Sequence, residues 1–223
     1  PGASKGGMTA SYYRRFYPDD VDGTVAYVAP LSLGAPDPRY IDFLESVGTQ
    51  SCRDALEQVQ LEALDRRAAM LQLAQQTAQS LGLAFDRIGG IEIAVEGLVI
   101  NMPFTFWQYS GLSFCSQIPG AGATDGAIWQ FLDDHAGLDW AADAHFEDFG
   151  AYYYQARAQL GYPAVATDWL EHLLVTDATN LEAGRLPVGA PSPTFDPAAM
   201  IDVADWVATS GDGLMFVYGE HDP

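Results

Sequence analysis

Residues 2–6 read Gly2-Ala3-Ser4-Lys5-Gly6, a G-x-S-x-G pattern at the start of the printed sequence. This spacing is typical of a sharp turn between a β-strand and an α-helix that exposes a nucleophilic serine. Glycines two before and two after the serine suit such a turn, because a strained backbone leaves little room for Cβ atoms. A full strand normally precedes the turn, so the match is either accidental or the chain is the later part of a longer protein.

The next segments supply the helix and strand that such a turn requires. Residues 5–18 (KGGMTASYYRRFYP) predict a short helix that Pro18 stops, and residues 21–30 (VDGTVAYVAP) predict a strand. Strand, turn, helix and strand in this order are typical of a parallel α/β sheet.

Residues 31–195 have a largely helical pattern instead. A Pro/Gly-rich loop opens this region, and a linker with the sequence LPVGAPSPTFDP closes it at residues 186–197. Between them, apolar residues at helical spacing and capping signals predict several helices. The expected helices are one long helix or a pair over 54–83, a helix in 91–106 ending before Pro103, one from Thr124-Asp125 to Leu132, one over 143–160, and a short one over 168–174.

The end of the chain returns to α/β character. Asp196-Pro197 predicts the start of a helix that runs to about Thr209, and LMFVY at 214–218 predicts a strand that leads into the sequence GEHDP. An apolar strand followed by such a turn commonly carries the acid of a serine hydrolase triad, which here is Asp222. The two ends together predict a partial α/β-hydrolase, with core segments at 1–30 and 196–223 and a helical lid at 31–195 inserted between core strands.

Three residues are the candidates for chemistry in this fold. Ser4 is the predicted nucleophile, and Asp222 is the predicted acid that orients a catalytic histidine. The backbone N–H of Lys5, directly after the nucleophile, is the predicted oxyanion-hole donor. A serine hydroxyl is a weak nucleophile, so a histidine must accept its proton during attack.

None of the four histidines suits that role. His135, His145 and His172 fall in the helical insertion, where packed or solvated histidines are the ordinary expectation, and His221 adjoins Asp222 and faces the other side of the turn. We therefore expect the base histidine beyond Pro223, and the first strands with a second oxyanion donor before Pro1. The piece alone should be inactive, and no cofactor or metal site is expected.

Charge and cysteine content limit the remaining classes. A net charge of −20 disfavours nucleic-acid and anionic-membrane partners, and no apolar run approaches the roughly 20 residues of a membrane helix. Cys52 and Cys115 are the only cysteines. They could form a disulfide in a secreted protein or remain two buried thiols, and the even count and the lysine-poor chain favour the disulfide.

Three stretches resemble the secreted bacterial proline-specific tri- and tetrapeptidyl aminopeptidases. These are SKGGMTASYYRRFYPDDVDGTVAYVAP, IEIAVEG with NMPFTFWQY, and LMFVYGEHDP. The resemblance implies an α/β-hydrolase fold with a helical lid, Ser4 as nucleophile and Asp222 as acid. It also implies an extracellular exopeptidase that releases short peptides, with proline at the cleaved position. The family usually has Gly-Gly-Ser-Lys-Gly-Gly, so Ala3 is a conservative departure.

An exopeptidase of this kind must recognise a peptide with a free N-terminus. Glu92 and Glu96 are spaced to share one helical face and could bind the ammonium, although two solvated helix carboxylates would show the same pattern. Phe104 and Trp107 could pack on a proline ring, or they could hold the lid on the core. The remaining parts of the same enzyme are the other expected partners.

Two other functions fit parts of this pattern. A lipase or esterase would use the same fold, but such enzymes usually place a small residue rather than lysine after the serine. A binding module with a decayed site would need no triad, whereas Ser4 and Asp222 are both present.

Overall fold

The computed structural model describes residues 1–176 and 178–223, and the chain divides into two compact units. The first unit consists of Pro1–Arg39, Gln155–Ala164 and Pro193–Asp222, and the second of Tyr40–Tyr154, Val165–Ser192 and Pro223. Residues 31–39 and 155–164 therefore belong with the chain ends. The sequence had placed both segments in the insertion at 31–195, so the observed boundaries differ from the expected ones.

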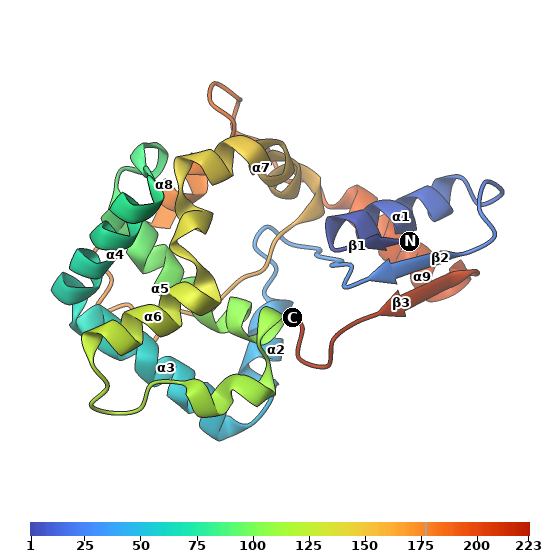
Figure 1. Cartoon of the computed structure of the whole chain (residues 1–223). Coiled ribbons are helices and arrows are strands. Elements are labelled where there is room, and N and C mark those ends of the chain that lie inside the picture. The colour runs from blue at the N-terminus through green and yellow to red at the C-terminus, as the bar shows by residue number, and fades with distance from the viewer. Residues whose placement is uncertain (177) are drawn as a thin grey trace. The chain divides into compact units, whose positions relative to one another are not determined.

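A three-stranded parallel sheet forms the centre of the first unit. Its strands are β1 (Gly2–Ala3), β2 (Thr24–Tyr27) and β3 (Leu214–Val217), in the order β1-β2-β3 (Figure 1). Ala3 pairs with Tyr27, and Tyr27 pairs with Val217, so all three strands end at the same level. The strand predicted over 21–30 is shorter because Val28 has a φ of 43° and leaves the extended region.

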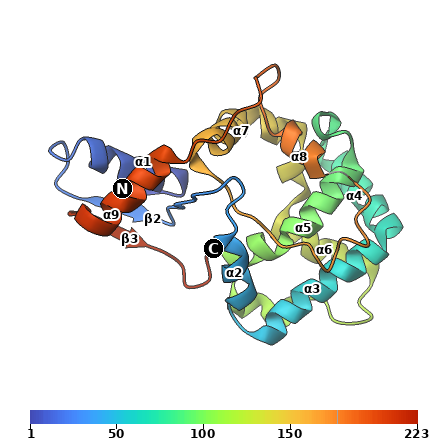
Figure 2. The same ribbon diagram turned by 180° about the vertical axis from the view of Figure 1, so that it is seen from behind.

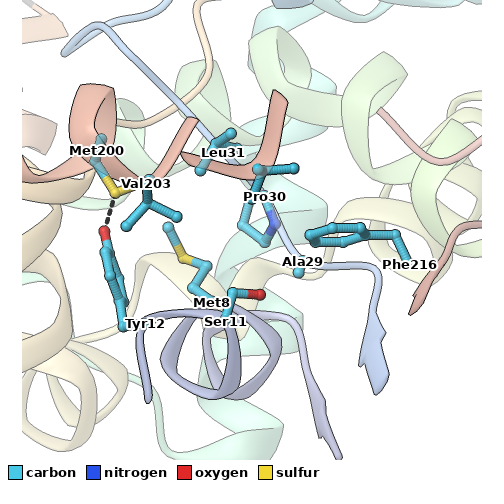
Figure 3. Close-up of a pocket in the computed structure, with 10 residues that line it drawn as sticks. Met8, Ser11, Tyr12, Ala29, Pro30, Leu31, Met200, Val203 and Phe216 are labelled. Carbon is cyan, nitrogen blue, oxygen red and sulfur yellow. Dashed lines mark hydrogen bonds between the residues drawn. The ribbon is translucent and has the colours of Figure 1, made fainter. Parts of the chain in front are cut away.

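Helices α1 (Lys5–Phe16) and α9 (Ala198–Ser210) pack against each other in this unit, and their ribbons overlap in both views (Figures 1 and 2). Met8 and Tyr12 of α1 face Met200 and Val203 of α9, and the Tyr12 hydroxyl donates to the Met200 sulfur (Figure 3). Only a void of about 20 Å³ remains between them. The two helices and the sheet thus form one packed core.

The strands bury alternate residues, as a sheet covered on one face does. Ala26 in β2 is fully buried. Tyr27 is 43% exposed, and Met215 and Val217 in β3 are 60% and 39% exposed. Within the described residues, the face that carries these side chains is left open. Parallel sheets are usually covered on both faces.

The second unit is helical. Its helices are α2 (Arg39–Ser46), α3 (Gln50–Asp65), α4 (Arg67–Leu81), α5 (Ile91–Tyr109), α6 (Asp125–Ala136), α7 (Asp143–Gln155) and α8 (Ala178–Gly184). Short 3-10 helices occupy Asp86–Ile88, Leu112–Gln117 and Leu138–Ala141, and the π-helical turn at Ala156–Leu160 that follows α7 belongs to the first unit. Helix α5 contacts α3, α4, α6 and α8 and lies at the centre (Figure 2). No helix among the described residues is long and apolar enough to cross a membrane.

Helix α5 does not end before Pro103, as the sequence predicted, but continues to Tyr109. A proline inside a helix removes the N–H that would bond to the carbonyl four residues earlier, which here belongs to Val99. The buried side chain of Gln60 donates to that carbonyl from α3, with an N–O distance of 2.8 Å. A tertiary contact therefore satisfies the carbonyl that Pro103 leaves free.

Some of the other predicted helices are present in the structure and one is not. Residues 54–83 form the pair α3 and α4, and the Thr124 side chain caps α6 by accepting from the Ala127 N–H, as expected. The helix predicted over 168–174 is wrong, because these residues form successive hydrogen-bonded turns. Helices α2 and α8 were not predicted.

Cys52 and Cys115 form a disulfide, which confirms the pairing favoured by the sequence. Cys52 is buried in α3, and Cys115 lies in the 3-10 helix at Leu112–Gln117 that follows α5. The bridge joins residues 63 positions apart in the chain. It fixes this loop to α3 within the helical unit.

We predict that the free energy of unfolding of the double variant Cys52→Ser/Cys115→Ser is about 3–5 kcal/mol lower than that of the wild type, because the unfolded variant lacks a cross-link that closes a long loop. Chemical denaturation of the full-length protein measures the difference. Adding a reductant should destabilise the wild type and leave the variant unchanged. Equal stability of the two proteins would contradict the prediction.

Candidate active site

Ser4 connects β1 directly to α1 and has an unusual backbone conformation. Its φ is 51° and its ψ is −126°, which is strained for a residue with a side chain. The Ser4 N–H donates to the Tyr27 carbonyl at 2.9 Å, and the Ser4 carbonyl accepts from the Met8 N–H at 3.1 Å. The hydroxyl is exposed and makes no capping hydrogen bond with α1. The turn therefore presents a free hydroxyl at the carboxyl end of the sheet.

Two glycines make this turn sterically allowed. A Cβ atom at Gly2 would lie 2.1 Å from the Gly6 carbonyl oxygen, and one at Gly7 would lie 2.7 Å from the Ala29 Cβ. A Cβ at Gly6 would meet nothing within 4 Å. The sequence correctly required glycine two residues before Ser4. After Ser4, however, the tight contact is made by Gly7 and not by Gly6.

Helix α1 begins at Lys5, directly after the turn. The first four N–H groups of a helix have no partner within the helix, and they carry a partial positive charge. The N–H of Lys5 is the first of them and directly follows Ser4. Ser4 therefore lies beside the partial positive charge of the α1 N-terminus.

Val28 is a second strained residue at this edge and was missed by the sequence reasoning. Its φ of 43° is rare for a β-branched side chain. Its N–H donates to the Val217 carbonyl at 2.7 Å, directly after the last pair of the β2–β3 ladder. Two of the three strands thus end in positive-φ residues at the same level of the sheet.

Asp222 lies in the turn after β3, in the same unit as Ser4. Its N–H donates to the Gly219 carbonyl at 3.4 Å, which closes the turn. The Tyr218 hydroxyl donates to the Ala29 carbonyl at 2.9 Å and ties the start of the turn to the chain after β2. Asp222 and His221 are both half-buried. The nucleophile and the acid predicted from the sequence therefore follow two strands that flank β2.

The histidines of the helical unit are packing residues or exposed. His135 Nδ1 lies 2.7 Å from the Ser110 hydroxyl, and His145 Nε2 lies 2.8 Å from the Tyr153 hydroxyl. Burial lowers the pKa of both imidazoles, against the opposing charges of nearby aspartates. His172 is exposed. These placements agree with the ordinary roles expected for the three.

Glu92 and Glu96 do not share an exposed face. Glu92 is exposed in the first turn of α5, whereas Glu96 is 2% exposed. The Glu96 carboxylate pairs with Arg67 of α4 at 2.5 Å and accepts from the N–H groups of Val175 and Thr176 at 2.8 and 2.9 Å, and from the Thr176 hydroxyl. Burial alone would raise the pKa of Glu96, but these hydrogen bonds and Arg67 outweigh it and lower the pKa.

The two predicted aromatic contacts lie in different surroundings. Phe104 is half-buried, with its ring centroid 6.2 Å from that of Tyr40. Trp107 is 2% exposed and packs edge-on against Phe106. A Cβ atom at Gly48 would lie 2.2 Å from the Trp107 ring, so that glycine makes room for it. Trp107 belongs mainly to the core of the helical unit.

Asp37 is a buried charge that the sequence reasoning did not identify. Its carboxylate accepts from Arg39 and from the Leu33 N–H, and its backbone bonds to Tyr162 and Ala164. The side-chain bond from Arg39 is the main cause that lowers the pKa of Asp37 to about 2, against the effect of burial. The Asp-Pro-Arg sequence was the available signal. Asp37 joins the loop after β2 to residues 155–164.

No group of three histidine, cysteine, aspartate or glutamate side chains within residues 1–176 and 178–223 is arranged to hold a metal ion. The described residues do bring an exposed serine to a helix N-terminus.

We predict that Gly7→Ala lowers the melting temperature strongly, whereas Gly6→Ala changes it little. The first variant forces a Cβ against Ala29 and the Tyr27 carbonyl, and overpacking of this kind typically costs about 1–3 kcal/mol. The second places its Cβ in open space. Thermal unfolding of both full-length variants measures the effect. Equal losses would contradict the assignment of the close contact to Gly7.

We further predict that Glu96→Gln destabilises the protein by about 2–4 kcal/mol at neutral pH, because it leaves Arg67 without its charged partner. Glu92→Gln is the control and should change stability by less than about 0.5 kcal/mol. Because the pKa of Glu96 is lower in the folded than in the unfolded protein, its ionised form stabilises the fold at any pH above the unfolded-state pKa. This stabilisation is lost as the pH falls through the pKa of Glu96 in the folded protein. The wild type and Glu96→Gln should therefore converge in acid. A gap that persists there would rule out the ionised pair as its source.

Comparison with known proteins gives the family. The sequence profile of the PS-10 peptidase S37 family matches residues 1–223. The chain is 41% identical over 223 residues to the prolyl tri/tetrapeptidyl aminopeptidase of Streptomyces mobaraensis. This match covers all of the present chain but only 46% of the length of that relative. No solved structure matches the chain. This chain belongs to the PS-10 peptidase S37 family.

Proposed function

We propose that this chain is part of a serine exopeptidase that removes tri- or tetrapeptides ending in proline from the N-terminus of its substrates. The observation that carries the proposal is the strained, exposed Ser4 between β1 and α1, in a chain of a peptidase family. The activity in the name of the Streptomyces relative supports the substrate class.

Ser4 would act as the nucleophile. Its Oγ attacks the carbonyl carbon of the scissile bond while a histidine accepts the hydroxyl proton. The carbonyl oxygen becomes an oxyanion beside the N-terminus of α1, where the Lys5 N–H stabilises it. The histidine then protonates the leaving amine, and water releases the short peptide from Ser4 by the reverse sequence.

The sheet supports Asp222 as the partner of that histidine. Ser4 and the Asp222 turn follow strands on either side of β2, which places these strands about 10 Å apart. An imidazole that makes two hydrogen bonds of about 2.8 Å can bridge side chains that reach inward from such strands. We propose that the histidine comes from a part of the enzyme outside this chain.

The proposed parent fold is an α/β-hydrolase with the helical unit as its lid. Support comes from the parallel order β1-β2-β3, with the serine after the first strand and the acid after the third. The open face with Tyr27, Met215 and Val217 would be covered by the rest of the enzyme. The Cys52–Cys115 disulfide supports export, since disulfides persist in oxidising compartments.

Recognition of the substrate ammonium would fall to Glu92 rather than Glu96. Glu96 already has a cationic partner and two backbone donors, whereas Glu92 is exposed. Phe104, half-buried beside Tyr40, remains the better candidate than Trp107 to contact a proline ring.

A fluorophosphonate probe and two substrates test the reaction class on the full-length protein. Labelling of Ser4 together with cleavage of Ala-Ala-Pro-anilide supports the peptidase. Labelling with cleavage of a short-chain ester alone would indicate an esterase, and the absence of labelling would indicate a binding module.

We predict that Ser4→Ala lowers turnover at least about a thousandfold, because the variant has no nucleophile. Asp222→Asn should lower turnover about 10⁴-fold, because the histidine loses its orientation. Glu220→Gln, an exposed acid in the same turn, is the matched control and should retain activity. Steady-state hydrolysis of the anilide, with thermal unfolding to confirm folding, provides the measurement. Full activity in Asp222→Asn would move the acid elsewhere.

A further inference from the structure

The helical unit contains a cavity of about 330 Å³ that none of the proposed steps uses. It lies between α2, α3, α5 and residues 165–169. Its apolar wall includes Leu44, Leu56, Ile100, Trp107 and Trp169. This volume is at the lower end of small-molecule sites, which are mostly apolar with a few polar groups.

Three carboxylates line the same cavity. They belong to Glu45 of α2, Glu57 of α3 and Asp168, and all three residues are exposed. Among the described residues, none of these three carboxylates makes a hydrogen bond or ion pair. These three side chains therefore place carboxylates beside an otherwise largely apolar wall.

Among the described residues that line this cavity, Arg53 is the one cation, and both of its Nη atoms donate elsewhere. Its Nη1 donates to the Val47 carbonyl at 2.6 Å, and its Nη2 donates to Gln50 at 2.7 Å. The charges around the cavity thus remain negative in sum. A cation is favoured over an anion or a neutral group in such surroundings.

The pKa of Glu57 is raised, as expected in surroundings with a net negative charge. Burial is the main cause that raises its pKa, and the charges of Asp54 and Glu45 add to it, while Arg53 opposes them. A positive charge brought next to Glu57 would relieve this repulsion.

We propose that this cavity binds an apolar ammonium, that is, a primary amine attached to an aromatic or branched alkyl group. The apolar part would lie against Trp107 and Trp169, and the ammonium would lie among Glu45, Glu57 and Asp168. The same chemistry occurs in free amines and in the first residue of a peptide. The proposal stands apart from the proposed peptidase reaction, since neither Ser4, Lys5 nor Asp222 lines the cavity.

Titration of the full-length protein with 2-phenylethylamine tests the proposal, with calorimetry and tryptophan fluorescence as readouts. We expect saturable binding with a dissociation constant of about 0.1–10 mM, which is reasonable for a ligand of this size. The neutral 2-phenylethanol and the anionic 3-phenylpropionate, which have similar shapes, should bind at least about tenfold more weakly.

Isosteric variants locate the site. Glu57→Gln and Asp168→Asn should each weaken amine binding about three- to tenfold, because each removes one carboxylate from the cavity. Asp65→Asn is the matched control, since Asp65 is an exposed acid at the end of the same helix α3 that does not line the cavity. All three positions are exposed, so the variants should fold.

Phenylalaninamide and its N-acetyl form distinguish the two sources of the ligand. If phenylalaninamide binds and its acetylated form does not, the ligands of the cavity include peptide amino termini. If only 2-phenylethylamine binds, the ligands are free amines. The proposal is overturned if the alcohol binds as tightly as the amine, if the control variant weakens binding as much as Glu57→Gln, or if the amine does not bind.

Discussion

The turn at Ser4 is the constraint on which the first unit depends. The chain passes from β1 to α1 through one residue with a φ of 51°, and this geometry brings α1 down onto the sheet. The approach is close enough that Gly2 and Gly7 have no room for a side chain. Met8 then reaches α9, and α9 leads into β3 and the turn with Asp222. The positions of Ser4 and Asp222 therefore follow from one backbone reversal.

Strain in this unit is confined to the edge where chemistry is proposed. Ser4 and Val28 are the two residues other than glycine with positive φ among those described, and both follow strands at the same level of the sheet. Such conformations cost about 1–3 kcal/mol each and persist only when the surrounding packing fixes them. Here the ladder bonds to Tyr27 and Val217 and the buried contacts of α1 supply that support. The result is an exposed hydroxyl that makes no capping hydrogen bond with its own helix.

In the helical unit, buried polar contacts fix the positions of helices whose apolar faces alone would allow several packings. Glu96 joins α5 to Arg67 of α4 and to residues 175–176, and Gln60 of α3 bonds to the Val99 carbonyl above Pro103. The disulfide adds a covalent tie between α3 and the loop after α5. An acid in this unit is therefore either enclosed by fixed partners or left accessible, and its burial decides which. Glu96 is enclosed, whereas Glu92, Glu45 and Glu57 face solvent or the cavity.

The sequence by itself determined the features that rest on neighbouring residues. The turn at Ser4 followed from glycine spacing and the start of α6 from the Thr124 cap, and the even cysteine count and the lysine-poor chain favoured the disulfide. Tertiary structure decided what depends on residues far apart in the chain. It made Gly7 rather than Gly6 the close contact, because Ala29 lies opposite, and it buried Glu96 against Arg67 while leaving Glu92 exposed. It also carried α5 through Pro103, because a side chain from another helix replaced the missing hydrogen bond, and a local pattern contains no record of such a partner.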